Sequence, residues 1–433
     1  MPWPGADRFS PGLGLAALSF VISIGQGATD SAVVVTVPLH QPDTRASSPP
    51  CAAISADGRF VAFISNARLV STDTNDRADV YVLDRESGGI SLETAGVTPV
   101  SDSTPVISAT GRFLVFEAIH DGDSARTQVL MIRDRESGVV RTLQRGAAQP
   151  DGSSRSPSIS ADGRYVAFAS GATNLVDGAD ANGMSEDVYI ADAASMTFRR
   201  ICPGPSGTQS ASGSSFAPSI SQDGRFVAFS STAPVDRLAT ASKTRGIDTY
   251  RYDTQTGVTT RVSVSDEGGA PDGSSYSPSI SGNGRYVAFV SDASNLVRRD
   301  RNKVADVFVR DMTAGLTELV SRTPSGAAGN GPSAHPALSG DGSIVVFQSD
   351  ASDLTCGRCA EAERDINLVA DIFRHDRRTG VTEMISRGRT PWMEPSLGPA
   401  TDGTGTVIAF ASRHPLDQAD DRHDYDLFVW MRR

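Results

Sequence analysis

The sequence predicts an all-β protein, a single seven-bladed β-propeller of four-stranded antiparallel blades. Three observations carry this prediction: a turn motif that recurs seven times, four short Val/Ile/Phe-rich segments in each unit, and a last unit that lacks its fourth segment. Short apolar segments bounded by Gly, Pro, Asp and Ser are typical of β-strands. A repeat of this length and composition is typical of a propeller or a related array.

The turn motif is the most regular feature of the chain. Its turn glycines Gly58, Gly111, Gly163, Gly224, Gly284 and Gly342 are separated by 53, 52, 61, 60 and 58 residues. Asp-Gly suits a tight hairpin, in which glycine takes the left-handed position. The seven copies are SADGRFVAF (55–63), SATGRFLVF (108–116), SADGRYVAF (160–168), SQDGRFVAF (221–229), SGNGRYVAF (281–289), SGDGSIVVF (339–347) and DGTGTVIAF (402–410).

The same motif also contains residue types found in catalytic sites, such as Ser160, Asp162 and Arg164. A catalytic triad would need a histidine beside the serine, and no histidine recurs with the motif. A catalytic group is needed once, whereas a hairpin is needed in every blade. We therefore interpret the motif as structural, with its final Phe packed between blades.

Unit 5 shows the four predicted strands most clearly. They are strand a at 278–281, strand b at 285–291, strand c at 306–311 and strand d at 316–322. The a–b and c–d connections are short. The b–c and d–a connections are long and variable, and they share the opposite face of a blade.

The two ends of the chain are predicted to close the ring. The last unit stops at a strand c (426–433), whereas the apolar segment 32–38 precedes the first strand a and resembles a strand d. Pairing of these two strands would remove an open sheet edge. We therefore predict a leader at 1–31 and one propeller domain at 32–433, with strand 32–38 completing the blade at 390–433.

These repeats resemble the TolB-type, WD-repeat-like propeller family. The resemblance lies in the pattern P-x-I-S-x-D-G-R-x-V-A-F followed by D-V-Y-V-R-D and T-G, and it covers nearly the whole chain after residue 31. It implies the fold and says little about function. TolB itself has six blades and an extra N-terminal domain, so its role in outer-membrane maintenance does not transfer to seven units. The G-x-S-x-G elbow of propeller-linked serine peptidases is also absent from the sequence.

Composition and charge point to an exported protein that does not bind nucleic acid. The formal net charge is −11 and no basic stripe is visible. The apolar run at 12–25 is too short for a membrane span and fits a secretory signal. We expect a periplasmic or secreted monomer, without a membrane span in the mature chain and with a local disulfide between Cys356 and Cys359.

The b–c connections contain a second recurrence, D-x-N-x-x-x-D. It presents alternating oxygen ligands and then a carboxylate from the next strand, which suits calcium. Asp and Asn also form such turns without a metal, and Arg299, Arg301 and Lys303 would oppose a cation in unit 5. Calcium is the one cofactor this pattern suggests. The candidate ligands are Asp73, Asn75, Asp79, Asp180, Asn182, Asp187, Asp300, Asn302, Asp306, Asp365, Asn367 and Asp371.

A third set of candidates lies just before strand a, where the units differ most from one another. At this end of the strand we expect the residues to surround the mouth of the central channel, the usual ligand site of a propeller. Ordinary variation of exposed loop tips is the alternative. The candidates are Arg155, Phe216, Tyr276, His335, Trp392 and Glu394.

Two functional hypotheses remain. The first is a non-enzymatic scaffold that binds a protein or a glycan through the b–c and d–a loops, stabilised by calcium where those loops hold it. The second is a propeller enzyme, a polysaccharide lyase or glycoside hydrolase, with His335 or Glu394 as base or acid and Arg155 holding an acidic sugar. The second hypothesis requires at least two titratable groups to converge in a pocket.

Overall fold

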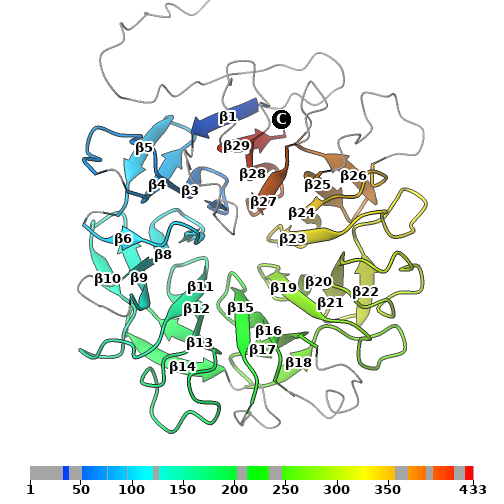
Figure 1. The fold of residues 1–433 in the computed structure, drawn as a ribbon, viewed down its shortest axis with the longest axis horizontal. Coiled ribbons are helices and arrows are strands. Elements are labelled where there is room, and N and C mark those ends of the chain that lie inside the picture. The colour runs from blue at the N-terminus through cyan, green and yellow to red at the C-terminus, as the bar shows by residue number, and fades with distance from the viewer. Residues whose placement is uncertain are drawn as a thin grey trace, which may run out of the picture.

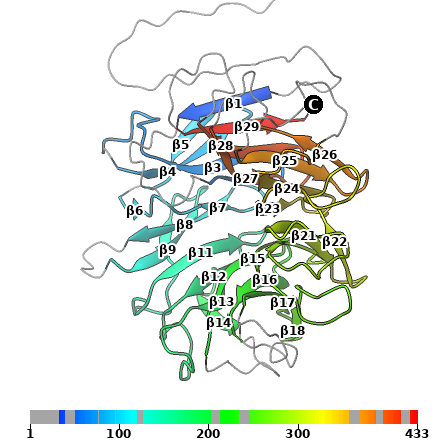
Figure 2. The same cartoon turned by 45° about the vertical axis from the view of Figure 1, so that its right-hand side comes forward.

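The computed structural model is a ring of seven antiparallel sheets around a central channel, as predicted (Figures 1 and 2). No helix among the described residues is long and apolar enough to cross a membrane. The predicted leader and the two cysteines of the predicted disulfide, Cys356 and Cys359, lie outside the described part of the chain. The structure describes residues 33–38, 51–75, 77–94, 96–119, 126–201, 212–233, 246–355, 369–386, 394–413 and 425–432.

Each blade runs outward from the channel through strands a, b, c and d. In blade 2, strand a is split into β6 and β7, which both pair with β8. Blades 1 to 3 contain β2 (Ala53–Ile54), β3 (Phe60–Ser65), β4 (Asp79–Asp84), β5 (Gly89–Leu92); β6 (Thr98–Pro99), β7 (Val106–Ile107), β8 (Phe113–Ile119), β9 (Gln128–Asp134), β10 (Val140–Thr142); and β11 (Ser154–Ile159), β12 (Tyr165–Ser170), β13 (Asp187–Asp192), β14 (Thr197–Ile201).

The remaining blades repeat this order. Blades 4 to 7 contain β15 (Ser215–Ile220), β16 (Phe226–Ser231), β17 (Asp248–Asp253), β18 (Thr259–Arg261); β19 (Ser275–Ile280), β20 (Tyr286–Ser291), β21 (Asp306–Asp311), β22 (Leu316–Leu319); β23 (Ser333–Leu338), β24 (Ile344–Ser349), β25 (Asp371–Asp376), β26 (Val381–Met384); and β27 (Ser396–Thr401), β28 (Val407–Ser412), β29 (Asp426–Met431), β1 (Val33–Pro38).

The ring closes as the sequence predicts. Strand β1 pairs antiparallel with β29 and supplies strand d of blade 7, so that the first and last strands share one sheet. A second closure runs around the channel. Seven backbone hydrogen bonds of 2.8–3.1 Å join each a–b turn to the next, and the last runs from the Gly403 amide to the Ala56 carbonyl. Every blade is therefore tied to both neighbours near the axis.

The core is divided among the spaces between adjacent blades. The final Phe of the turn motif is almost fully buried in all seven copies. Phe63, for example, lies in one cluster with Val407 and Ala409 of blade 7. In six blades this Phe also packs on an aromatic ring of strand c, as Phe168 does on Tyr189 at 5.7 Å between ring centroids. The predicted packing between blades is confirmed.

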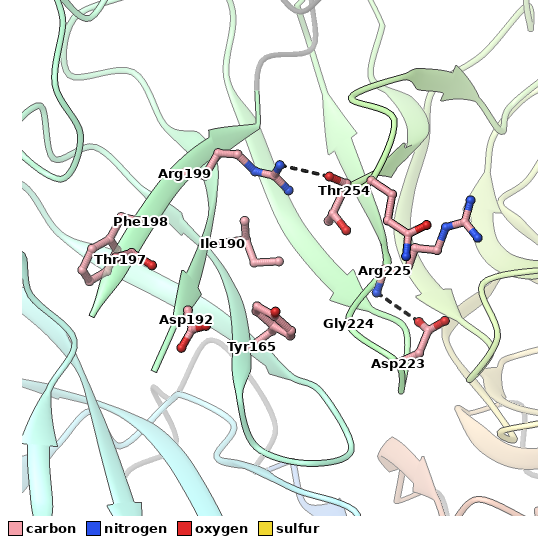
Figure 3. Close-up of a pocket in the computed structure, with 11 residues that line it drawn as sticks. Tyr165, Ile190, Asp192, Thr197, Phe198, Arg199, Asp223, Gly224, Arg225 and Thr254 are labelled. Carbon is pink, nitrogen blue, oxygen red and sulfur yellow. Dashed lines mark hydrogen bonds between the residues drawn. The ribbon is translucent and has the colours of Figure 1, made fainter. Parts of the chain in front are cut away.

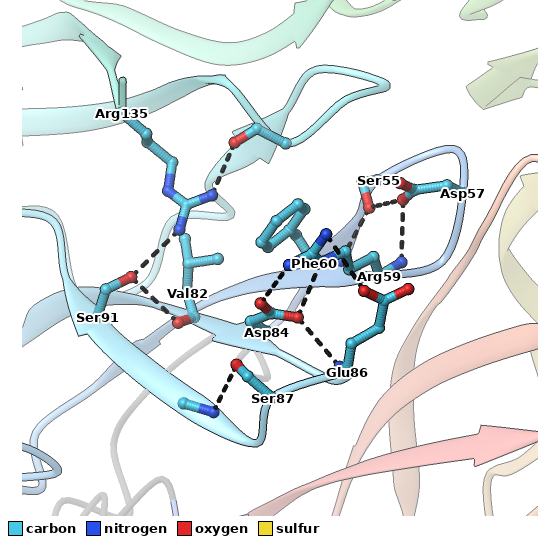
Figure 4. A network of polar contacts seen from close by, with 12 residues as sticks. Ser55, Asp57, Arg59, Phe60, Val82, Asp84, Glu86, Ser87, Ser91 and Arg135 are labelled. Atoms are coloured by element: carbon cyan, nitrogen blue, oxygen red, sulfur yellow. Dashed lines mark hydrogen bonds and ion pairs between the residues drawn. The ribbon is translucent and has the colours of Figure 1, made fainter. Parts of the chain in front are cut away.

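The turn motif itself is a local hydrogen-bond unit. In blade 3 the Ser160 hydroxyl donates to Asp162 at 2.6 Å and accepts the Tyr165 amide at 2.9 Å. The Arg164 guanidinium donates to Asp192 at the end of strand c. Figure 4 shows the same network in blade 1, where Arg59 binds Asp84 with two hydrogen bonds. The residues that resemble a catalytic set are therefore all used within the blade.

The turn glycine is required by geometry. Gly163 has a φ of +74°, and a Cβ atom there would lie 2.1 Å from the Phe113 ring of the preceding blade. The aromatic residue after the motif arginine of one blade therefore fills the space that a side chain at the turn glycine of the next blade would need.

Two faces of the ring follow from this arrangement. The turn face is formed by the a–b and c–d turns, which in blade 3 are residues 160–164 and 193–196. The loop face is formed by the b–c and d–a loops, which are residues 171–186 within blade 3 and 143–153 leading into it.

Candidate functional site

The channel mouth on the loop face is shaped by a bulge in strand a of blades 3 to 7. Strand a begins with a buried serine that pairs with a serine at the end of strand b, as Ser154 does with Ser170 at 2.9 Å. Two residues later the chain takes a left-handed conformation directly before a proline. The left-handed residues are Ser156, Ala217, Ser277, His335 and Gly398. The bulge also explains why β19 begins at Ser275, three residues before the predicted strand.

The structure does not place the predicted mouth residues at equivalent positions. Arg155, Phe216 and Tyr276 come directly before the bulge residue, whereas His335 is the bulge residue itself. Glu394 comes before β27 and lies near Tyr425 and Arg413 of the same blade. Trp392 lies outside the described residues.

Arg155 belongs to a cluster with two carboxylates. Its guanidinium donates to Glu186, and its charge also interacts with Glu117 of blade 2. Glu117 is buried, and its Oε1 accepts the Ser156 amide at 2.8 Å. Burial raises the pKa of the Glu117 carboxyl group. Glu117 is not among the predicted site residues, although the sequence contains a signal for it: the corresponding residue after the motif Phe is Ile, Ala, Ser, Val, Gln or Ala in the other units.

The other predicted mouth residues have separate surroundings. Tyr276 packs against the core between blades 5 and 6 and hydrogen-bonds Asp292, and burial raises the pKa of its phenol. Phe216 is half-buried on β15. His335 lies on β23 with an exposed side chain, and desolvation by nearby protein atoms lowers the pKa of its imidazole. Polar contacts among the described residues join Arg155, Glu117 and Glu186 into one cluster. This cluster does not include His335 or Glu394.

The Asn side-chain amide donates to the last Asp in the loops of blades 1, 3 and 5, but the first Asp has different surroundings in each. In blade 1 the Asn75 side-chain amide donates to Asp79 at 2.9 Å, and the Tyr81 hydroxyl donates to Asp73 at 2.6 Å. Asn75 therefore presents a nitrogen to the carboxylate, whereas calcium binding requires an oxygen. This loop is held together by its own hydrogen bonds.

In blade 3 an arginine occupies the position of a cation. Arg200 from strand d lies 3.1 Å from Asp180 and 3.4 Å from Asp187, and all three side chains are nearly buried. The Asn182 side chain also donates to the Gly213 carbonyl of the following d–a loop. The guanidinium therefore neutralises the two carboxylates on which the calcium hypothesis rested.

In blade 5 neither the tyrosine hydroxyl nor the arginine is present, while the Asn302 side-chain amide donates to Asp306 at 2.7 Å, as Asn75 does to Asp79 in blade 1. Phe308 and Leu319 take the places of Tyr189 and Arg200 of blade 3. Asp300 is only 5 % exposed, and its Oδ1 has no hydrogen-bond partner among the described residues. Burial raises the pKa of Asp300 to about 6 and that of Asp306 to about 7.

In blade 6, Asp365 and Asn367 lie outside the described residues, while buried Asp371 accepts the Ser386 hydroxyl at 2.6 Å. The described residues contain no group of three or more His, Cys, Asp or Glu side chains placed to hold a metal ion. Calcium binding therefore stays a prediction. The contacts in blades 1 and 3 disfavour it there, so that among the described loops blade 5 is the remaining candidate.

Hydrogen bonds also hold the d–a loops to the b–c loops. Asp151 accepts the amide and the hydroxyl of Thr173, both at 2.6 Å, and Asp272 accepts the same two groups of Ser294 at 2.7 Å. In blade 6 the Asn330 amide group bonds Ser352 twice at 2.9 Å. The loop face is therefore fixed by contacts that recur from blade to blade.

Comparison with known proteins supports the fold. No protein family and no curated protein sequence matches the chain. Among solved structures, an oligogalacturonate lyase in complex with manganese is 14 % identical, with 96 % of this chain and 97 % of that one covered and a TM-score of 0.57. An oligogalacturonate lyase from Vibrio parahaemolyticus is 12 % identical, with 93 % and 98 % covered and a TM-score of 0.54.

The TolB-type resemblance is supported only at the level of the propeller fold. TolB from Acinetobacter baumannii is 14 % identical, with 93 % of this chain and 96 % of that one covered, but its TM-score is 0.41. At these identities the similarities show the fold alone. The chain is a seven-bladed β-propeller, and its function has to be argued from its own residues.

Proposed function

We propose that this propeller is a non-enzymatic scaffold that binds a protein or a glycan through its loop face. The observation that carries the proposal is the set of hydrogen bonds between d–a and b–c loops, made by Asp151, Asp272 and Asn330. Loops that are already ordered lose less conformational entropy when a partner binds. Variable side chains on ordered loops of a rigid ring are the usual arrangement of a recognition surface.

The partner is proposed to lie in the cell envelope or outside the cell, with the propeller exported as a periplasmic or secreted monomer. Half-buried Phe216 and Tyr276 at the channel mouth offer aromatic surface to a sugar ring or an apolar side chain. Arg155, held between Glu117 and Glu186, offers a positioned donor group.

The experiment uses the full chain as bait for envelope extract and for a glycan array. The loop-face variant carries Phe216→Ala and Tyr276→Ala, and the turn-face control carries Arg225→Ala. We expect the loop-face variant to lose at least one partner by tenfold or more, while the control retains it. Identical partners for all three proteins would contradict the proposal.

A second candidate function is cleavage of an acidic polysaccharide at the channel mouth. It is favoured by the cluster around Arg155, in which burial raises the pKa of Glu117, and by a fold shared along nearly the full length with oligogalacturonate lyases. Glu117, and not Glu394, is the carboxyl group beside Arg155.

This candidate is tested by incubating the chain with oligogalacturonate, with and without manganese, and following unsaturated product by ultraviolet absorbance. Product formation that Arg155→Ala abolishes would replace the scaffold proposal with the enzyme. If no product forms either with or without manganese, this lyase activity is excluded as the function.

A further inference from the structure

Arginine side chains lie at every junction between blades on the turn face. At five junctions the guanidinium donates to the carbonyl of a turn glycine. The distances are 2.8 Å for Arg135 to Gly111, 2.7 Å for Arg251 to Gly284, 2.6 Å for Arg377 to Gly342 and 2.9 Å for Arg374 to Gly405, and Arg85 contacts Gly58 in the same way.

Three of these arginines also stack on the aromatic residue that follows the motif arginine. Arg251 lies 4.4 Å from the Phe226 ring centroid, and Arg225 lies 4.7 Å from the same ring. Phe60 and Tyr286 likewise have two guanidinium groups within 4.9 Å. An aromatic ring with two guanidinium neighbours and a glycine carbonyl is therefore a recurring arrangement of this fold, and each part of it is favourable for a guanidinium.

The junction between blades 3 and 4 has the ring and the turn but lacks the second arginine. Tyr165 has only Arg164 over its ring, at 4.9 Å. Arg199 crosses the junction farther out and donates to the Thr254 carbonyl at 3.0 Å. Among the described residues, no guanidinium reaches the carbonyl of Gly224.

A cavity of about 470 Å³ occupies this place (Figure 3). Its wall contains both positions from which the other junctions supply their arginine. Ile190 stands where blade 4 has Arg251, and Thr254 stands where blade 2 has Arg135 and blade 6 has Arg377. The cavity is also lined by Tyr165, Gly224, Asp223 and Asp192, whose carboxylate also accepts a hydrogen bond from Arg164.

We propose that this cavity binds a guanidinium group supplied from outside the chain, as an arginine side chain of a polypeptide or as free arginine. The group stacks on Tyr165 and donates to the Gly224 carbonyl and to the acidic wall. Arg225, which also lines the cavity, is neutralised by Asp253 at 2.8 Å. The positive charge of Arg199 at the outer edge opposes the ligand, but this fold already places two guanidinium groups around one ring at three other junctions.

The neighbouring junction between blades 2 and 3 provides a matched control. There Arg141 takes the outer route and donates to the Ala193 carbonyl at 3.3 Å. The cavity beside Phe113 is smaller, about 250 Å³, and includes Ile132 and Val139 in its wall. It offers a guanidinium less space and fewer polar contacts.

The test titrates the full chain with Nα-acetyl-L-arginine amide, free L-arginine and Nα-acetyl-L-lysine amide, followed by saturation-transfer NMR. We expect the blocked arginine to bind with a dissociation constant on the order of 1 mM, and the lysine compound, which cannot stack as a planar fork, to bind at least tenfold more weakly. Equal affinity for the blocked and the free arginine indicates the side chain of a polypeptide, whereas tighter binding of free arginine indicates the amino acid.

Two variants locate the site. Thr254→Arg supplies the missing internal arginine and should abolish binding while the melting temperature stays the same or rises, whereas Ala193→Arg at the control junction should leave binding unchanged. Tyr165→Leu, which removes the ring, should weaken binding at least tenfold. The proposal would be overturned if the wild-type chain did not bind arginine. It would also be overturned if arginine binding survived both Thr254→Arg and Tyr165→Leu.

Discussion

The turn face and the loop face each carry a recurring sequence motif. The turn motif makes the same contacts in blade after blade, whereas the first Asp of the Asp-x-Asn motif on the loop face is satisfied differently in blades 1, 3 and 5. The Ser-x-Asp-Gly-Arg unit bonds itself and the end of strand c in blades 1, 3 and 4 alike. The Asp-x-Asn unit of the loop face pairs with Tyr81 in blade 1 and with Arg200 in blade 3, and in blade 5 it leaves Asp300 with an oxygen that lacks a partner.

The difference has a physical origin. The contacts of the turn face lie within the motif or between residues that recur together, so they repeat whenever the motif does. The first Asp of each Asp-x-Asn loop depends on a residue from strand c or d, and the residues at those positions vary between blades. A recurring motif therefore predicts a recurring contact only when its partners recur with it.

The largest effect that this comparison predicts concerns two left-handed glycines. Gly163→Ala on the turn face adds a methyl group 2.1 Å from the Phe113 ring at a φ of +74°. Backbone strain and overpacking together should lower the free energy of unfolding by about 3 kcal/mol. Urea denaturation followed by circular dichroism measures the change.

Gly183→Ala on the loop face is the control. Its φ is +66°, but no atom lies within 4 Å of the added Cβ. Only the backbone cost of about 1 kcal/mol should remain. Equal losses for the two variants would show that packing between blades does not constrain the turn glycine.

The second prediction concerns one Asp position in two blades. Asp180→Asn removes a partner of buried Arg200 and should destabilise the protein at pH 7 by about 2 kcal/mol. Asp300→Asn replaces a buried carboxyl group whose raised pKa favours its protonated form. It should stabilise the protein by about 1–2 kcal/mol at pH 8 and have little effect at pH 4.

The sign follows from proton binding. Between the unfolded pKa of about 4 and the folded pKa, the folded chain binds more protons at Asp300 than the unfolded chain, so stability falls as the pH rises. Denaturation at pH 4, 6 and 8 should show the gap between Asp300→Asn and wild type opening over this window. A constant gap would contradict burial of an uncompensated carboxyl group.

Much of the fold is predictable from the sequence because its signals are local and repeated. The seven turn motifs fix the blade number, and the unpaired segment 32–38 predicts the closure with β29. The site is less predictable. Glu117 stands at a position where every other unit has an uncharged residue, and its nearness to Arg155 depends on the bulge of the next blade. The missing arginine beside Tyr165 is visible only once the junctions are compared in three dimensions.

The third prediction concerns the ion pairs of the turn face: one variant removes a pair, and a second variant adds one. Arg225→Ala removes the two hydrogen bonds to Asp253, and because solvent screens this exposed pair, the loss of stability at pH 7 should be small. Hydrogen bonding to Arg225 lowers the pKa of Asp253 to about 2. That contribution is present above pH 4 and is lost as the pH falls toward 2, so the variant and the wild type should converge in acid.

Blade 6 provides the reciprocal change. Ser343 stands where five of the other six motifs have arginine, and Asp376 ends strand c beside it. Ser343→Arg should raise the free energy of unfolding by up to about 1 kcal/mol. Acid denaturation curves of the two variants measure both effects. If Ser343→Arg gains no stability at any pH, the ion pair with Asp376 needs the aromatic ring that other blades have in place of Ile344.

The smallest effect is expected for calcium. The loops of blades 1 and 3 satisfy their carboxylates with Asn75, Tyr81 and Arg200, so a chelator has nothing to remove from them. The melting temperature should therefore agree within about 1 °C with and without EDTA, because a ligand that binds only the native state must raise its stability. A melting temperature that falls in EDTA and recovers when calcium is added would contradict this expectation. Loss of that response in Asp300→Asn, but not in Asp73→Asn, would then place the ion in blade 5, where the buried Oδ1 of Asp300 lacks a hydrogen-bond partner among the described residues.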